Sequence, residues 1–310
     1  MKDMIIRMEN LQRNFGDLRA VDSISLEVPA GIVFGYLGPN GSGKTTTMRL
    51  LLGLLEPSGG RAQVLGYDVA SQADEIRLRS GALLEHTGLY ERLSAEDNLD
   101  FYGRVWRLPV AERRQRIRQL LTDLDLWERR QEVVGKWSRG MKQKLAVGRA
   151  LLHNPQLVFL DEPTAGLDPV AAAALRQDLE NLARQHGVTV FLTTHNLAEA
   201  EKLCSRVAVI RQGRLLAVGS PDELRQHAGA DRLEIVGHNF TETALAGLRR
   251  HPSVQEVSSN GEHLLVHVQP GTEAAPLVQL LVAAGTQIEE VRKGKASLEE
   301  VFLTLMEEEQ

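Results

Sequence analysis

A glycine-rich loop holds the most distinctive pattern of polar residues in the chain. The loop consists of Gly38, Pro39, Asn40, Gly41, Ser42, Gly43, Lys44, Thr45 and Thr46. It fits the phosphate-binding pattern GxxxxGK[ST] at every fixed position. Its glycines let backbone N–H groups converge on phosphate oxygens, and the helix that follows presents its positive end to the same anion. The pattern predicts that Lys44 reaches the terminal phosphates and that the Thr45 hydroxyl binds Mg²⁺. The alternative, an ordinary Gly/Ser turn, leaves the strand before the loop and the helix after it unexplained.

Two carboxylates and a histidine follow buried strands later in the chain. The apolar run Leu157–Leu160 is typical of a strand covered on both faces, and it leads directly into Asp161 and Glu162. A second such run, Val188–Leu192, leads to His195. Open α/β sheets bind ligands at the carboxyl ends of their strands, so we expect these side chains near the loop. The alternatives are surface acids at a strand end and a histidine satisfied within the core.

The composition favours a globular protein with one large domain and one small domain. The chain has 310 residues, 43% of them apolar, and a formal net charge of −5, so nucleic acid is not expected as a primary partner. We expect the arginines between Arg104 and Arg130 to form a solvated helix face. The single cysteine, Cys204, fits a reducing compartment. The N-terminus has no signal-peptide pattern and no run of 18 apolar residues occurs, which together favour a cytoplasmic location.

The elements around the loop predict a mixed α/β domain. Apolar positions alternate in Ile5–Leu11 and Ile24–Val28, which indicates antiparallel strands. A helix is expected over Met48–Leu55 and a strand over Ala62–Tyr67. Phe15 lies in the turn between the first two strands, where it could stack on an adenine ring or pack against the edge of the sheet. The residues alone leave both interpretations open.

The middle third of the chain is expected to be helical. Ser94 and Asp97 form a capping box for a helix that continues to about Trp106. Apolar residues between 117 and 124 recur at helical spacing, with arginines on the other face. Ser138 is placed to cap a further helix, whose N-terminus is a second potential anion site. Because strand signals are missing here, we expect a helical subdomain at about 90–150, inserted between strands of the sheet.

The last eighty residues predict a separate small domain. After a turn-prone segment at 228–230, the pattern indicates the order βαββαβ followed by a helix, and Asn260-Gly261 is a hairpin-turn signal. This order suggests a ferredoxin-like module. The module contains no catalytic constellation. Its histidines lack metal-ligand spacing, so we expect them to be structural or solvated.

Taken together, these motifs resemble the ATP-binding cassette (ABC) ATPase family over about residues 4–224. The glycine-rich loop resembles the Walker A motif, residues 157–162 resemble Walker B, residues 165–168 resemble the D-loop, and His195 resembles the switch histidine. Residues 138–140 resemble the signature motif, although Trp137, Arg139 and Met141 stand where the common form has Leu, Gly and Gln. The C-terminal module resembles the tail of exporter ATPases of the daunorubicin-resistance and sodium-export kind.

The resemblance implies a separate role for each of the site residues. ATP and Mg²⁺ are the implied cofactors, with Thr45 as a direct metal ligand and Asp161 acting through water. Glu162 polarises the attacking water, and Lys44 and His195 are the other catalytic residues. Two cassettes pair head to tail in this family. The residues implied to contact the nucleotide of the partner subunit are Ser138, Gly140 and Asp168.

Glu85 is a sharper departure from the family pattern. It occupies the position where the family usually has the glutamine of the Q-loop. We hypothesise that Glu85 approaches Mg²⁺ or the attacking water and slows basal turnover. The alternative is that its carboxylate faces solvent, as loop acids usually do.

The overall expectation is an α/β P-loop ABC ATPase domain at 1–225 and an accessory or dimerisation domain at 231–310. It predicts the ATP-hydrolysing subunit of an exporter, which forms a homodimer or pairs with a similar subunit. A separate membrane permease would hold it at the inner face of the cell membrane. One alternative is a soluble ABC protein acting on ribosomes or DNA, which usually has two cassettes or long coiled-coil insertions. Another is a regulator that binds nucleotide without hydrolysis, which the presence of Glu162 and His195 disfavours.

Overall fold

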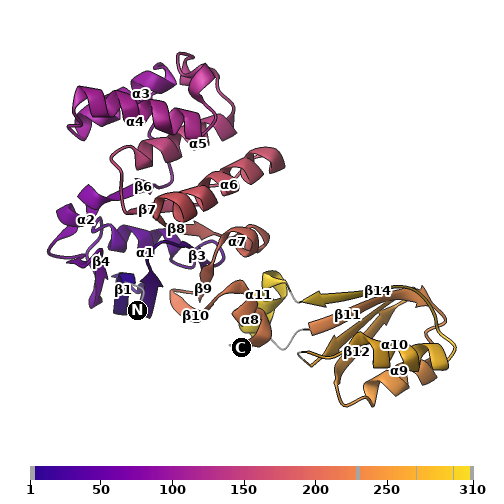
Figure 1. Cartoon of the computed structure of the whole chain (residues 1–310). Coiled ribbons are helices and arrows are strands. Elements are labelled where there is room, and N and C mark those ends of the chain that lie inside the picture. The colour runs from indigo at the N-terminus through magenta and orange to yellow at the C-terminus, as the bar shows by residue number, and fades with distance from the viewer. Residues whose placement is uncertain (1–3, 228–230, 270, 296, 308–310) are drawn as a thin grey trace. The chain divides into compact units, whose positions relative to one another are not determined.

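The chain folds into two compact units, Met1–Val218 and Gly219–Gln310, in the computed structural model. The structure describes residues 4–227, 231–269, 271–295 and 297–307. Both units are drawn in Figure 1, with the second in orange and yellow. The division falls a few residues before the expected domain limit at 225, and the expected linker at 228–230 lies outside the described residues. Within the described ranges, no helix combines the length and apolar character needed to cross a membrane.

An antiparallel sheet with the order β2-β1-β4-β5 opens the first unit. Its strands are β1 (Met4–Phe15), β2 (Leu18–Pro29), β4 (Gly59–Val64) and β5 (Tyr67–Asp68). The first two strands extend beyond the ranges expected from the sequence, because their hairpin continues to the pair Phe15 and Leu18. The strand expected over 62–67 is divided in two, because Leu65 and Gly66 both adopt positive φ and turn the chain.

A six-stranded sheet with the order β10-β9-β3-β8-β7-β6 forms the centre of the first unit. Its strands are β3 (Val33–Leu37), β6 (Ser80–Leu83), β7 (Leu157–Asp161), β8 (Thr189–Thr194), β9 (Arg206–Arg211) and β10 (Arg214–Gly219). All but β10 pair in parallel, so their carboxyl ends meet at one edge. Every residue of β3, β7 and β8 is buried, which explains their continuous apolar runs. Strand β10, which follows β9 after Gln212 and Gly213, was not predicted from the sequence.

Four helices lie close to this central sheet (Figure 1). They are α1 (Lys44–Leu51), α2 (Ala73–Arg79), α6 (Pro169–His186) and α7 (Leu197–Leu203). The first begins four residues before the expected start at Met48. Gly43, with a φ of 100°, ends the loop immediately before Lys44, and Gly53, with a φ of 61°, turns the chain after the helix.

The middle of the chain forms a helical subdomain, as predicted. Its helices are α3 (Ala95–Val105), α4 (Val110–Asp123) and α5 (Arg139–Leu151), with short 3₁₀ turns at Trp127–Arg129 and Val134–Lys136. Ser94 caps α3 by accepting a hydrogen bond from the Asp97 amide at 3.1 Å. In Figure 1 these helices stand together at the end of the first unit opposite the antiparallel sheet.

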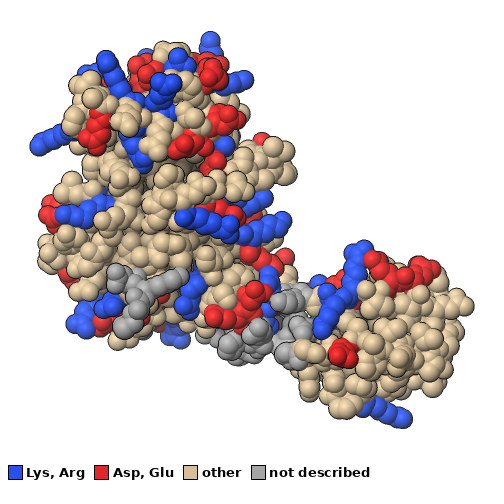
Figure 2. Space-filling view, in the orientation of Figure 1, with Lys and Arg blue, Asp and Glu red and all other residues tan. Residues whose placement is uncertain are grey.

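Most arginines of the helical subdomain are exposed, and Arg113 is buried beside an acidic partner. Figure 2 shows basic and acidic side chains interspersed over this part of the molecule. Arg104 and Arg113 both pair with Asp100, at 2.7 and 2.5 Å. Arg130 lies 3.9 Å from Glu96. Most of these arginines therefore form a solvated face, as expected from the sequence, whereas Arg113 is buried and pairs with Asp100.

The second unit has its own hydrophobic core and the ferredoxin-like order predicted from the sequence. Its elements are α8 (Pro221–His227), β11 (Asp231–His238), α9 (Glu242–Arg249), β12 (Val254–Asn260), β13 (His263–Val268), α10 (Ala274–Ala283), β14 (Gln287–Lys295) and α11 (Leu298–Glu307). The sheet order is β12-β13-β11-β14. Its pairings are antiparallel, and Gly261, with a φ of 64°, begins the predicted hairpin turn. Leu233, Val266 and Leu281 belong to a core of buried apolar residues.

Candidate functional site

The glycine-rich loop connects β3 to α1 at the carboxyl edge of the central sheet. A Cβ atom built on Gly38 would lie 2.5 Å from the carbonyl oxygen of Ile210 in β9. One built on Gly43 would lie 2.2 Å from the carbonyl oxygen of Ala20 in β2. Both distances are far below van der Waals contact, so these positions accept only glycine without a shift of backbone. The neighbouring strands therefore hold the loop in one path.

Lys44, the first residue of α1, is buried within the loop. Its side chain is 7% exposed. The ammonium group donates hydrogen bonds to the carbonyl oxygens of Gly38 at 2.8 Å and Pro39 at 3.1 Å. It also lies 3.5 Å from Oε1 of Glu162. The loop thus encloses a positive charge whose nearest acid comes from the end of β7.

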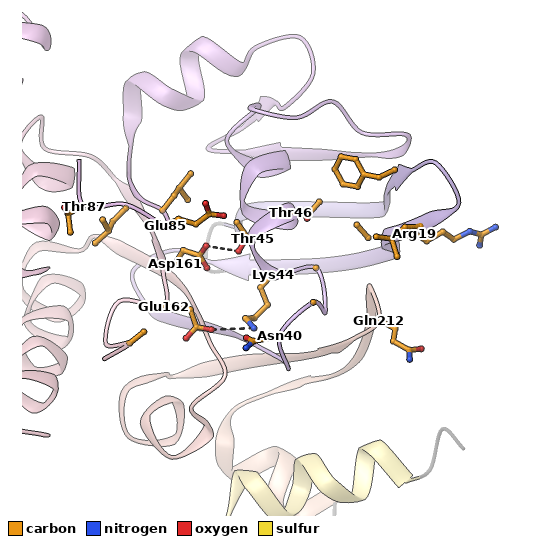
Figure 3. Close-up of a pocket in the computed structure, with 18 of the residues that line it drawn as sticks. Arg19, Asn40, Lys44, Thr45, Thr46, Glu85, Thr87, Asp161, Glu162 and Gln212 are labelled. Carbon is orange, nitrogen blue, oxygen red and sulfur yellow. Dashed lines mark hydrogen bonds and ion pairs between the residues drawn. The ribbon is translucent and has the colours of Figure 1, made fainter. Parts of the chain in front are cut away.

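Thr45 and Asp161 meet beside the loop (Figure 3). The Thr45 hydroxyl donates to Oδ2 of Asp161 at 2.8 Å. The other carboxylate oxygen accepts a hydrogen bond from the Thr193 hydroxyl, in β8. A hydroxyl and a buried carboxylate are oxygen donors of the kind that Mg²⁺ prefers, so the residues present fit this ion.

Glu162 and His195 form a second pair at the ends of β7 and β8. Nδ1 of His195 lies 2.9 Å from each carboxylate oxygen of Glu162. Glu162 adopts a positive φ of 48°, which is uncommon for a residue with a side chain. Its amide donates to the carbonyl oxygen of Thr193 at 3.1 Å, which holds this conformation. A strained residue held by its neighbours is typical of a functional site.

These groups border a cavity of about 930 Å³. The residues singled out from the sequence that line it are Phe15, Asn40, Gly41, Gly43, Lys44, Thr45, Thr46, Glu85, Arg139, Asp161, Glu162 and Ala165. His195 reaches the site through its contact with Glu162. Gly38 and Pro39 contribute carbonyl groups to Lys44. The Ser42 carbonyl accepts a hydrogen bond from the Gly213 amide at 3.1 Å, which fastens the loop to the turn before β10.

Phe15 lies at the tip of the β1–β2 hairpin. Its side chain is 45% exposed, and the guanidinium carbon of Arg13 stands 4.6 Å from the ring centroid. Arg19 and Gln212 line the same cavity as Phe15 (Figure 3). An exposed ring that borders the cavity fits the stacking interpretation better than the packing one.

Glu85 lines the cavity, and its carboxylate is paired. Its Oε1 lies 2.8 Å from Nη2 of Arg49, on α1. Figure 3 shows Glu85 beside Thr45 and Asp161. The Glu85 side chain is 56% exposed, so it is both solvated and at the cavity edge.

Ser138, Gly140 and Asp168 are not among the residues that line this cavity, although Arg139, which lies between the first two, and Ala165 do line it. Ser138 caps α5 by accepting from the Met141 amide at 3.3 Å. Asp168 caps α6 by accepting from the amides of Val170 and Ala171 at 3.0 and 2.9 Å. A Cβ atom on Gly140 would stand 2.8 Å from the Cβ of Ala171, so α5 and α6 approach closely there. Both oxygen-bearing side chains thus have a structural task in their own chain.

Among the residues that received no role from the sequence, Thr193 and Arg49 bond directly to site carboxylates. Thr193 bonds Asp161 and the amide of Glu162, at 3.1 Å for the latter. Its place at the end of a buried strand was the signal that could have identified it. Arg49 had no such signal, because an arginine within a helix after a phosphate loop is ordinary.

Comparison with known proteins gives matches over both units. Residues 21–165 match the family described as ABC transporter, and residues 219–306 match the family described as ATP-binding protein DrrA1-3-like, C-terminal domain. The daunorubicin resistance ATP-binding protein DrrA3 of Streptomyces coeruleorubidus is 37% identical, over 98% of this chain and 96% of that protein. The Nod factor export ATP-binding protein I of Cupriavidus metallidurans is 38% identical, over 97% of each chain.

A solved structure agrees with the sequence matches. It is titled as the structure of the ATP-binding subunit of an ABC transporter. The two chains are 32% identical and superpose with a TM-score of 0.65, covering 73% of this chain and 93% of the other. The fold of the ATP-binding unit is therefore known from experiment in a similar protein.

Proposed function

The chain belongs to the ABC transporter family of ATP-binding proteins and is the ATP-hydrolysing subunit of an exporter, and from this premise we propose how its residues work and what it assembles with. The observation that carries the proposal is the convergence of Lys44, the Thr45–Asp161 pair and the Glu162–His195 pair on one cavity. These groups come from the ends of two adjacent parallel strands, β7 and β8, and from the loop after β3, which pairs with β8.

Phosphate binding is assigned to the loop and Lys44. The amides of residues 41–46 and the N-terminal end of α1 would face the phosphates, and Lys44 would add a full positive charge. Thr45 and Asp161 would hold Mg²⁺, which supplies charge neutralisation and orientation of the β- and γ-phosphates when bound. Phe15 would stack on the base, since its exposed ring borders the cavity.

Hydrolysis is assigned to Glu162 and His195. Glu162 would accept a hydrogen bond from the attacking water and align it with the γ-phosphorus. Since Nδ1 of His195 is used toward Glu162, at 2.9 Å, we assign Nε2 to the γ-phosphate. The positive φ of Glu162, held by β8, would keep its carboxylate at a constant place during turnover.

Matched substitutions test this assignment. Glu162→Gln removes the charge of the group that aligns water, and we expect ATP hydrolysis to fall by at least about 100-fold while ATP binding is retained. Lys44→Ala is expected to lose both. Glu27→Gln is the control, because Glu27 is 59% exposed and paired with Arg7 on the antiparallel sheet. Hydrolysis by Glu162→Gln at the rate of the control would refute the role of Glu162.

We also propose that the complete site forms between two chains. Ser138, Gly140 and Asp168 stand at helix N-termini and do not line the cavity of their own chain, although Arg139 beside them does. Backbone N–H groups and the helix dipole can bind an anion at such positions. Head-to-tail pairing would bring them to the γ-phosphate held by the partner. Glu162→Gln should therefore elute as a dimer in size-exclusion chromatography with ATP and Mg²⁺ and as a monomer without them. Monomeric elution under both conditions would contradict pairing through ATP.

The helical subdomain is our proposed docking surface for a membrane permease. Tyr90 and Phe101 are 47% and 40% exposed, and their ring centroids are 4.9 Å apart. Tyr102 lies edge-on to Phe101 at 5.3 Å and donates a hydrogen bond to the carbonyl oxygen of Gly88. This aromatic cluster is thus joined to the segment that carries Glu85 to the cavity. A partner bound there would sense the site through that segment.

Co-purification in detergent tests the docking surface. We expect the intact chain to retain a permease, which would hold it at the membrane, and Phe101→Glu to lose that permease while ATP hydrolysis by the isolated chain is unchanged. Val282→Glu, at an exposed apolar position of the second unit, is the control. Retention of ribosomes or DNA in place of a membrane protein would favour a soluble ABC protein instead.

For the C-terminal unit we propose a role in dimerisation or regulation. It has a separate hydrophobic core and matches its own family description. A chain that ends after Gly219 should bind ATP but pair more weakly. If pairing, hydrolysis and permease binding all equal those of the full chain, this role is excluded.

A further inference from the structure

We propose that Arg49 is a positioning residue that neutralises Glu85, so that an acid can stand at the metal side of the nucleotide cavity without weakening nucleotide binding. The inference rests on the proposed function of this cavity and goes beyond it by assigning a task to a residue outside the phosphate loop. Its basis is the contact of 2.8 Å between Arg49 Nη2 and Glu85 Oε1.

The geometry places Arg49 behind Glu85. Arg49 follows Thr45 by four residues on α1, so the two side chains share one face of the helix. Glu85 and Thr45 both line the cavity, whereas Arg49 is absent from the residues described as lining it. Arg49 therefore acts on a bound nucleotide through Glu85, which Figure 3 places next to Thr45 and Asp161.

A counter-ion beside Glu85 matters because its carboxylate stands at the edge of a cavity proposed to bind an anion. The lining of this cavity contains three carboxylates, Asp161, Glu162 and Glu85, and three cations, Lys44, Arg19 and Arg139. The contact that the structure shows for Glu85 is with Arg49, whereas Lys44 lies 3.5 Å from Glu162. ATP is itself a polyanion, so an uncompensated carboxylate at position 85 would repel it. Arg49 removes that repulsion while leaving the oxygen atoms of Glu85 at the cavity edge.

The exposure of the pair sets the size of the effect. Arg49 is 40% exposed and Glu85 is 56% exposed, so water and salt screen their interaction. Exposed ion pairs contribute little free energy in general. The alternative is therefore that the Arg49–Glu85 pair is a surface contact without effect on nucleotide binding. The Arg61–Glu9 pair is a suitable comparison: its contact is 2.7 Å, its side chains are 71% and 55% exposed, and it lies on the antiparallel sheet.

A charge-rescue experiment on the full chain tests the inference. The probe is the non-hydrolysable analogue AMP-PNP with Mg²⁺, titrated at low and high salt, with ATP hydrolysis measured in parallel. We expect Arg49→Gln to weaken binding by about two- to five-fold at low salt, with a smaller effect at high salt. The double variant Arg49→Gln/Glu85→Gln should bind as tightly as Glu85→Gln alone. Arg49→Lys should retain most of the parent affinity, and Arg61→Gln all of it.

The outcomes separate the inference from the proposed function. If Arg49→Gln binds as tightly as Arg61→Gln does, the pair is only a surface contact and the inference is overturned. If the double variant keeps the full defect of Arg49→Gln, Arg49 does not act through Glu85, which also overturns it. If Lys44→Ala binds the analogue as the parent does, the proposed nucleotide site itself is wrong, whatever Arg49 does.

Discussion

The two units of this protein are both sheets covered by helices, yet they place their polar groups differently. The first unit buries Lys44, Asp161 and Thr193 around the cavity. In the second unit, Thr286 is the one buried polar side chain among the residues that the structure describes. Burying a charged group is costly unless it is paired. The first unit accepts that cost where the nucleotide chemistry requires it, whereas the second unit is built mainly from apolar packing.

Glycine substitutions should give the largest contrast between the units. Gly43 and Gly261 both have positive φ, at 100° and 64°, but a Cβ on Gly43 meets the Ala20 carbonyl oxygen at 2.2 Å and a Cβ on Gly261 meets nothing within 4 Å. We expect Gly43→Ala to abolish ATP binding, because the loop must move. Gly261→Ala should cost about 1 kcal/mol of stability and leave ATP binding unchanged. ATP titration and urea unfolding of both variants would measure this, and equal effects would remove the contrast.

The pH dependence of stability should also differ between the units. His153 stacks on Trp106, with ring centroids 3.9 Å apart, and burial lowers the pKa of its imidazole from 6.5 to about 4. Between these pH values the unfolded chain binds a proton that the folded chain does not. The free energy of unfolding of the first unit should therefore rise from pH 4 to 6.5, and this histidine should account for about 3 kcal/mol of the rise.

Urea unfolding between pH 4 and pH 7 measures this dependence. His153→Gln should flatten the slope. His263→Gln, at an exposed position of the second unit, should leave the slope as it is. If the free energy of unfolding of His153→Gln changes with pH as steeply as that of the parent chain, other groups cause the pH dependence.

Nucleotide should stabilise one unit and not the other. At a concentration 100 times its dissociation constant, a ligand that binds the folded state alone adds about 2.7 kcal/mol. AMP-PNP with Mg²⁺ should raise the unfolding temperature of the first unit and leave that of the second unchanged, and calorimetry would measure both. A common shift of one single transition would show instead that the two units unfold together.

Helix caps should give the smallest contrast. Asp168 caps α6 in the first unit, and Thr241 caps α9 in the second by accepting from the Ala244 amide at 3.3 Å. Replacing either by alanine should cost about 1 kcal/mol of stability. Asp168→Ala should additionally reduce ATP hydrolysis, since we assign Asp168 to the site of the partner chain. Equal hydrolysis by Asp168→Ala and Thr241→Ala would leave Asp168 as a cap alone.

Local patterns predicted most of the fold and the outline of the site. The period-2 and continuous apolar runs identified the strands, because a half-buried strand alternates apolar and polar residues and a fully buried strand is apolar throughout. The helical subdomain and the βαββαβ order of the second unit followed in the same way. Element ends were less accurate. The helix after the loop starts at Lys44 and not at Met48, because tertiary contacts of Gly43 set where the loop stops.

The phosphate loop, its lysine and threonine, and the acids at the strand ends could be identified from local sequence, because each depends on neighbouring residues. Which distant groups meet depends on the fold. Thr45 bonds Asp161 across 116 positions, and Arg49 pairs with Glu85 across 36. No local signal encodes such pairs, since they arise when parallel strands bring their carboxyl ends to one edge. The charge at position 85 was evident from the chain, but its counter-ion was evident only from the fold.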